Sequence, residues 1–407
     1  MTLRVARARI GARVVRIRTT SHRASMAHAH RFAPRMRARR ASTFANDAFE
    51  RVAATLRALN VDLPLHMREA VDVIAAAPGV KAHDDARDAH PFVVPIAQSD
   101  EGHTLGVYVG AHVARGARDG VGFGFFSAGR ADASARDGAT ASGTTPATSL
   151  MRAPIVRCGA RGLDLLASNA TMFVRRRLAE DEDRFGLGGG AASRAAGVGA
   201  LDAYAPGEFQ SSPFKHRMEV FLTKNVGRFM DVDEALIAWH VDKKDETSAL
   251  VTAEWYADGP YGGWARPYAV NAQTLMMHGR AIEARDQARV ALSAGPWWTM
   301  GADEALLDSM KTLSGYAGQS AADVRRTLDG GDVPVGGASG NVDNGEPAPT
   351  KEQLAVKRAM AVLDAVAWGE GEGWTRSRET VAECLDEAGF RDMSEFVLHG
   401  LRASTAS

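Results

Sequence analysis

The segment after Phe185 carries the kind of glycines that a phosphate-binding loop needs. It reads FGLGGGAASRAAG, and closely spaced glycines allow backbone N–H groups to surround a phosphate. A nucleotide loop also needs either a Gly-Lys-Ser/Thr ending or a preceding strand with an acidic residue further along. The chain has none of these features here, so we predict a loop over residues 186–212.

Acidic residues that could ligate a cation begin at Asp231, followed by Asp233 and Glu234, with His240 and Asp242 further along. Calcium loops distribute their ligands over twelve residues around a central glycine, and that pattern is missing. Acidic residues are also favoured at the start of a helix, where they interact with its dipole. We prefer this second explanation and expect neither a metal nor a cofactor.

No acid–base or nucleophilic signature stands out. His216 follows Glu208 and precedes Glu219, but these residues form no recognisable catalytic pattern. The motifs His-Glu-x-x-His, Gly-x-Ser-x-Gly and Cys-x-x-Cys do not occur. Cys158 and Cys384 lie far apart, and we expect two idle or buried thiols. The sequence therefore favours a protein that is not an enzyme, although a site assembled from distant residues stays open.

Large aromatic residues gather around one helical segment. Trp, Tyr and Arg dominate the hot spots of protein interfaces, but large aromatics also fill cores. We expect Trp255 and Trp264 to lie in the core. Trp297 and Trp298 follow a helix end, so we expect one of the two on the surface. The candidate protein-binding residues are Trp297, Trp298, Arg266 and Trp264.

The segment 268–296 has the spacing of one tetratricopeptide repeat. Small residues let two antiparallel helices approach closely, a glycine permits the turn between them, and a proline ends the second helix. A single repeat is not an array, so an ordinary Ala-rich helical hairpin is an equally open explanation. The repeat positions are Tyr268, Ala272, Leu275, Gly279, Ala284, Ala288, Ala291 and Pro296.

The first 46 residues have the composition of a transit peptide. No Asp or Glu precedes Asp47, whereas twelve Arg occur from Arg4 to Arg40. The remaining residues carry 49 acidic and 49 − 12 = 37 basic side chains, a net charge of −12. This balance argues against nucleic-acid binding. We expect import into the chloroplast or, alternatively, the mitochondrion. No apolar run is long enough to span a membrane.

The elements predict an α+β protein, with a small α/β part followed by a larger helical part that resembles tetratricopeptide repeats. Apolar residues at 92–96 precede a turn at Ser99–Gly102, and apolar residues alternate with others over 105–109, which predicts a β-hairpin. A strand at 154–157 and a helix over Leu163–Leu178 complete the α/β part. Thr350 and Gln353 form a capping-box start for a helix. The predicted divisions are a transit peptide (1–46), helices and a hairpin (47–110), a disordered insertion (111–149), a strand and helix (150–185), a loop (186–212), a helical domain (213–329), a linker (330–349) and C-terminal helices (350–407).

Three stretches are similar to a plant and green-algal group of plastid tetratricopeptide-like proteins. They are HPFVVPIA at His90–Ala97, PIVRCGARGLDLLASN at Pro154–Asn169, and YGGWARPYAVNAQTLMMHGRAIEARDQARVALSAGPWWTMG at Tyr261–Gly301. The resemblance implies a stromal or thylakoid-associated plastid protein. It implies no catalytic residue for this chain.

Two main functions remain open, beside a structural subunit whose surface is fully used inside one complex. The first is an imported scaffold or assembly factor whose helical surface binds a protein client, with a photosynthetic complex as the expected setting and a peripheral thylakoid association left open. The second is an enzyme or small-ligand protein whose site lies between the α/β and helical parts. A cleft where Arg157, Arg161, His216 or Asp231 converge would favour the second function.

Overall fold

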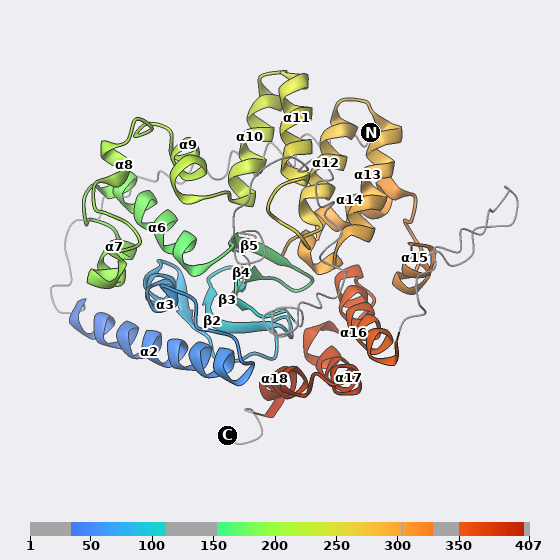
Figure 1. Cartoon of the computed structure of the whole chain (residues 1–407), viewed down its shortest axis with the longest axis horizontal. Helices are drawn as coiled ribbons and strands as arrows, with labels where there is room; N and C mark the ends of the chain where they lie inside the picture. The colour runs from blue at the N-terminus through green and yellow to red at the C-terminus, as the bar shows by residue number, and fades with distance from the viewer. Residues whose placement is uncertain (1–33, 111–152, 303, 329–349, 403–407) are drawn as a thin grey trace, which may run out of the picture.

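The computed structural model describes residues 34–110, 153–302, 304–328 and 350–402. Within these ranges a central sheet is surrounded by helices (Figure 1). The strands are β1 (Val80–Ala82), β2 (Val93–Ser99), β3 (Thr104–Tyr108), β4 (Ile155–Cys158) and β5 (Leu163–Ala167). The helices before residue 260 are α2 (Pro34–Ala58), α3 (Met67–Ala76), α6 (Ala170–Phe185), α7 (Ala191–Ala196), η1 (Gly197–Ala200), α8 (Glu208–Ser211), α9 (Met218–Phe221), η2 (Leu222–Val226), α10 (Met230–Asp242) and α11 (Glu246–Ala257). The later helices are α12 (Arg266–Met277), α13 (Ala281–Ala294), η3 (Trp297–Met300), α14 (Ala305–Ser314), α15 (Ala321–Leu328), α16 (Lys351–Trp368), α17 (Gly373–Glu387) and α18 (Arg391–Arg402).

The sheet is an antiparallel meander in which each strand pairs with the next one along the chain. The predicted hairpin is confirmed as β2 and β3, with Val93 opposite Tyr108. Both strands are mostly buried, because helices cover the sheet. The α+β fold class is therefore confirmed.

The helix predicted from Leu163 is wrong at its start. Burial alternates along this segment: Leu163, Leu165 and Ala167 are buried, whereas the residues between them are less buried. The segment forms β5, which pairs with β4. The helix α6 begins only after Asn169, whose side chain accepts a hydrogen bond from the backbone N–H of Met172. That N-cap marks the boundary that apolar spacing alone did not show.

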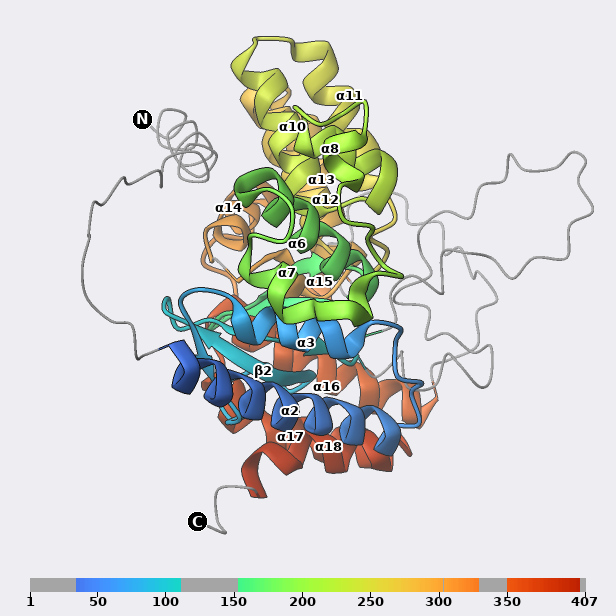
Figure 2. The same ribbon diagram turned by 90° about the vertical axis from the view of Figure 1, so that its left-hand side faces the viewer.

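Helices from both ends of the chain pack around the sheet. Figure 2 shows α2 and α3 in front of β2. From the opposite end of the chain, Trp374 of α17 donates to the carbonyl of Gly159 in the β4–β5 turn at 3.0 Å. Arg378, also on α17, donates to the carbonyl of Ala89 just before β2 at 2.8 Å. The buried apolar side chains of all these parts form one continuous core.

In the larger helical part, α10 to α14 pack one against the next. The predicted hairpin around Gly279 is confirmed as α12 and α13. Gly279 takes a φ of +78°, which glycine adopts without strain. The alanines at 272, 284, 288 and 291 are fully buried, so the helices approach closely. Membership in the tetratricopeptide superfamily stays a prediction.

Several predicted boundaries differ from the structure or lie outside it. The predicted loop 186–212 contains α7 and α8, and α7 forms because its alanines pack while Asp181 accepts from the N–H of Ser193. The predicted insertion 111–149, the linker 330–349 and residues 1–33 of the predicted leader lie outside the described residues. The rest of that leader belongs to α2. The capping box at Thr350 is confirmed.

Within the described part of the chain, no helix has both the length and the hydropathy needed to cross a membrane.

Candidate functional site

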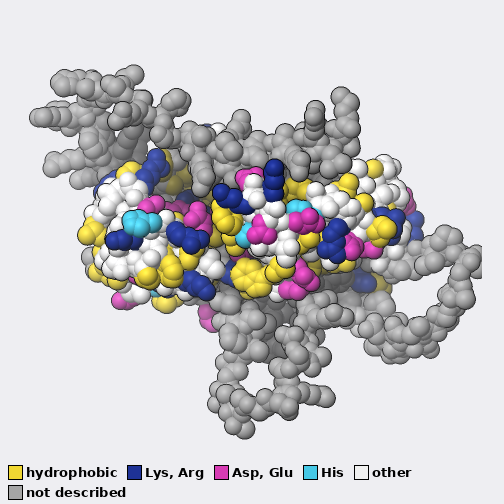
Figure 3. All heavy atoms as spheres, turned by 90° about the horizontal axis from the view of Figure 1, so that it is seen from above, with side chains coloured by type: hydrophobic (Ala, Val, Ile, Leu, Met, Phe, Trp, Pro, Cys, Tyr) yellow, Lys and Arg dark blue, Asp and Glu magenta, His cyan; other side chains and the backbone are white. Residues whose placement is uncertain are grey.

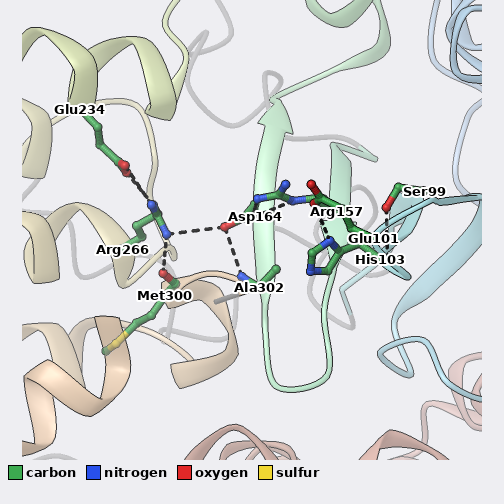
Figure 4. Close-up of polar contacts among 9 residues, drawn as sticks. All are labelled: Ser99, Glu101, His103, Arg157, Asp164, Glu234, Arg266, Met300 and Ala302. Atoms are coloured by element: carbon green, nitrogen blue, oxygen red, sulfur yellow. Dashed lines mark hydrogen bonds and ion pairs between the residues drawn. The ribbon is translucent and has the colours of Figure 1, made fainter. Parts of the chain in front are cut away.

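The junction between the sheet and the helical part is held by charged side chains (Figure 4). Asp164 on β5 accepts from Nε of Arg157 on β4 at 2.9 Å and from the backbone N–H of Ala302 at 3.1 Å. Arg266 at the start of α12 approaches the same carboxylate, with 3.5 Å between its Nη1 and Oδ1. Arg266 also donates twice to Glu234 on α10, from Nε at 2.5 Å and from Nη2 at 2.9 Å. These contacts join β4, β5, α10 and α12 into one network.

Within this network, Asp164 and Arg266 keep each other ionised. Burial alone would raise the pKa of Asp164, but Arg266 and Arg157 outweigh it and hold that pKa below its usual value. Burial would likewise lower the pKa of Arg266, but Glu234 and Asp164 raise it well above its ordinary value. A general acid or base needs a pKa near the working pH. The network therefore stabilises the contact between the sheet and the helical part.

The acidic residues considered as a cation site have separate cationic partners. Asp231 accepts two hydrogen bonds from Arg176, at 2.6 and 2.7 Å. Asp233 is buried and accepts from Arg228 at 2.9 Å. Glu234 is paired with Arg266. Asp231 and Asp233 lie in the first turn of α10 and Glu234 follows directly, as the helix-start explanation predicts.

His240 and Asp242 lie at the other end of α10, and His240 faces Asp245 at 3.6 Å. Among the described residues, no three His, Cys, Asp or Glu side chains come together in a way that could hold a metal ion. Cys158 and Cys384 are both buried and free. Burial raises the pKa of the Cys158 thiol to about 12, so it is a poor nucleophile.

The prediction that Trp297 or Trp298 lies on the surface is wrong, because both side chains are buried. One of the pair would face solvent if the chain left the interior after the helix end at Pro296. Instead, η3 continues the chain through the interior between the sheet and α16. The Trp297 ring lies 4.4 Å from that of Trp368 on α16, and the Trp298 ring lies 5.1 Å from that of His90. The two neighbours do point apart, but both directions lead into the core.

The other two predicted protein-binding residues are also interior. Trp264 is buried and packs edge-on against Tyr108 of β3, as the core prediction states. Arg266 belongs to the ion-pair network. The prediction that Trp255 lies in the core is wrong, because 46% of this residue is exposed.

An exposed apolar surface lies instead on the outward side of α10 and α11. We call it the outer face and define it as Leu236, Trp239, Val251 and Trp255, of which 41%, 50%, 59% and 46% are exposed. The spacings of three residues on α10 and four on α11 place each pair on one side of its helix. The two helices project beyond the rest of the molecule in Figures 1 and 2.

The sequence did contain a signal for the outer face. The spacing of Leu236 and Trp239 predicts an apolar stripe on one side of the helix. The structure shows that α10 also buries Ile237 and Ala238 on another side. A helix that is apolar on opposite sides needs cover on both. The apolar residues on a second side of α10 are the signal for this surface in the sequence.

Comparisons with known proteins match two segments of the helical part. Residues 230–317, which span α10 to α14, match the PAB middle domain, and residues 343–399 match the PAB C-terminal domain. An Arabidopsis thaliana protein named "Protein IN CHLOROPLAST ATPASE BIOGENESIS, chloroplastic" is 31% identical over 250 residues, covering 61% of this chain and 70% of that protein. No solved structure matches the chain. The chain is a chloroplast protein, and the prediction of that compartment over the mitochondrion is confirmed.

Proposed function

Because this chain belongs to the family of the Arabidopsis thaliana protein IN CHLOROPLAST ATPASE BIOGENESIS, we propose that it serves as an assembly factor in the biogenesis of the chloroplast ATPase. It does so by binding a protein client through the outer face of α10 and α11. The tetratricopeptide-like packing of α10 to α14 provides the rigid support for that face.

The observation that carries this proposal is the distribution of tryptophan. The chain has seven Trp, and five of them are buried, whereas Trp239 and Trp255 are about half exposed. Both exposed residues lie on one pair of neighbouring helices. Exposing a Trp to water costs free energy that burial in an interface recovers, and Trp is the residue most enriched at the centres of interfaces.

The alternative of a ligand site between the two parts has less support. Arg157 is paired with Asp164, and Arg161 donates to the carbonyl of Ala367 and to Glu304. His216 is exposed on a different segment. These groups therefore do not converge on one cleft. One cavity of about 440 Å³ lies between α2 and the chain after β1, on different elements from that junction.

The test is affinity purification of the tagged protein from isolated chloroplasts, followed by mass spectrometry. We expect subunits of the chloroplast ATPase to be recovered with the native chain. The double variant Trp239→Ser/Trp255→Ser should recover at least about tenfold less, since loss of each hot-spot Trp costs at least about 2 kcal/mol of binding free energy.

A matched control is Ile282→Ser, because Ile282 is 70% exposed and lies on α13 instead of α10 or α11. This control should recover ATPase subunits normally. Recovery of no ATPase subunit by the native chain would overturn the proposed function. Equal recovery by the native chain and the double variant would show that another surface binds the client.

A further inference from the structure

We propose that the outer face takes an amphipathic helix of the partner whose apolar stripe is bordered by Lys or Arg. This inference rests on the proposed function, because it specifies the chemistry of the client at the same surface.

The shape of the outer face fits a helix. α10 and α11 have 13 and 12 residues and pack side by side. At 1.5 Å of rise per residue they offer a surface about 18 to 20 Å long, the length of roughly three to four helical turns. The shallow groove between two packed helices accepts the ridge of side chains of a third helix. Recognition of an amphipathic helix by an apolar groove follows the same geometry.

Both supporting helices are apolar on two sides. α11 buries Ala249, Ala253 and Tyr256 on its inner side, while Val251 and Trp255 face outward. Such a distribution is typical of a helix with neighbours on both sides. In a stack of helices, the terminal pair normally has a polar outer side that ends the stack. On α10 and α11 the exposed side instead carries the four apolar residues of the outer face, so the partner helix would continue the stack.

The charge around the outer face is acidic. Asp242, Glu254 and Asp258 are exposed, and in the described part of the chain none of them forms an ion pair. The exposed acidic residues at the connection between these helices also include Asp245 and Glu246, which face His240 and His278, against the exposed Lys243 and Lys244. Figure 3, which looks onto this end of the molecule, shows hydrophobic and acidic side chains side by side.

The nearby cations do not cancel this charge. Arg228 lies over the Trp255 ring, 3.3 Å from its centroid, but it is already paired with Asp233. Lys243 lies 5.9 Å from the centroid of the Trp239 ring. Complementary charges bordering an apolar contact give orientation and fast association. The rim therefore favours Lys and Arg on the partner, and it disfavours an anionic lipid surface, which would repel it.

The experiment uses the two exposed tryptophans as reporters. Acrylamide reaches Trp239 and Trp255, whereas the other five Trp are buried. Two synthetic 18-residue helices with the same Leu pattern serve as probes, one carrying Lys and the other Glu on the polar side. We expect the Lys helix to protect the native chain from quenching and to bind at least about tenfold more tightly than the Glu helix. Its affinity should also fall as salt rises.

Two variants keep both reporters. Leu236→Ser/Val251→Ser removes apolar contact, and Asp242→Asn/Glu254→Gln/Asp258→Asn removes the acidic rim. All five side chains are exposed, so neither variant should disturb folding. Each should weaken binding of the Lys helix at least about tenfold, while Ile282→Ser should leave it unchanged.

Equal binding of the two helices, or full binding to the rim variant, would overturn the inference. Protection that appears without peptide as the protein concentration rises would assign the outer face to a second copy of this chain, and would overturn it as well. If chloroplast purification recovers ATPase subunits while the Lys helix does not bind, only this inference fails. If no ATPase subunit is recovered, the proposed function fails independently of the peptide result.

Discussion

Replacement of Arg266 by Met tests whether the buried ion-pair network stabilises the contact between the sheet and the helical part. Met keeps most of the apolar volume of the Arg side chain and removes its charge. Only 12% of the Arg266 side chain is exposed, and it donates to Glu234 and to the carbonyl of Met300. Removing one partner of a buried ion pair typically costs about 3 to 5 kcal/mol of unfolding free energy.

The lower end of this range applies here. Asp164 would keep Arg157 and the N–H of Ala302, and Glu234 would keep the hydroxyl of Tyr256 at 2.9 Å. We therefore expect Arg266→Met to lower the unfolding free energy by about 3 kcal/mol. Glu234→Gln combined with Arg266→Met should cost less than the sum of the two single changes, since both remove the same interaction.

Urea denaturation followed by circular dichroism measures this loss. The control is Arg358→Met, because Arg358 pairs with Glu387 on the surface, where both side chains are 58% exposed. Surface pairs of this kind contribute about 0 to 1 kcal/mol. If Arg266→Met lowers the unfolding free energy by less than about 1 kcal/mol, similar to the control, the network does not stabilise this contact.

Three further changes test the core and its pH dependence. Trp298→Ala should lower the unfolding free energy by about 3 to 5 kcal/mol, because the side chain is fully buried; an unchanged urea midpoint would contradict the buried position. Gly162→Ala should cost about 1 to 3 kcal/mol or more, since its Cβ would lie 2.1 Å from the carbonyl oxygen of Gly301, a backbone atom that cannot rotate away. Normal stability of that variant would mean that the β4–β5 turn does not approach so closely. Burial, and then the charge of Arg378, lower the pKa of His90 well below 6.5. The unfolded chain therefore binds a proton first, so the contribution of His90 to the unfolding free energy should be constant above about pH 7 and fall as the pH drops below 6.5. His90→Gln should remove that part of the decline, and an identical pH profile for both proteins would exclude His90 as its source.

Local signals in the sequence predicted the parts of the fold that depend on neighbouring residues. The apolar run before Ser99–Gly102 and the alternation after it predicted β2 and β3, and Thr350 predicted the start of α16. Residues three or four positions apart decide these features, so one segment carries the whole signal. The same holds for the turn at Gly279 and the alanines around it.

The missed features depend on contacts between distant segments. Leu163, Leu165 and Ala167 form a strand because β4 pairs with them, whereas their spacing is also compatible with a helix. Trp297 and Trp298 are buried because α16, which follows more than fifty residues later, packs against η3. No local pattern shows which elements will cover a given segment. For that reason the sequence predicted a surface position for Trp297 or Trp298, both of which the structure buries.

The central claim is that the outer face of α10 and α11 is needed for ATPase biogenesis. The most direct test replaces the native chain in its host with Trp239→Ser/Trp255→Ser as the only copy, and measures assembled chloroplast ATPase by native electrophoresis. We expect the variant protein to accumulate normally, because both side chains are about half exposed, while assembled ATPase falls severalfold relative to the Ile282→Ser control. Normal ATPase levels with the double variant would contradict the account.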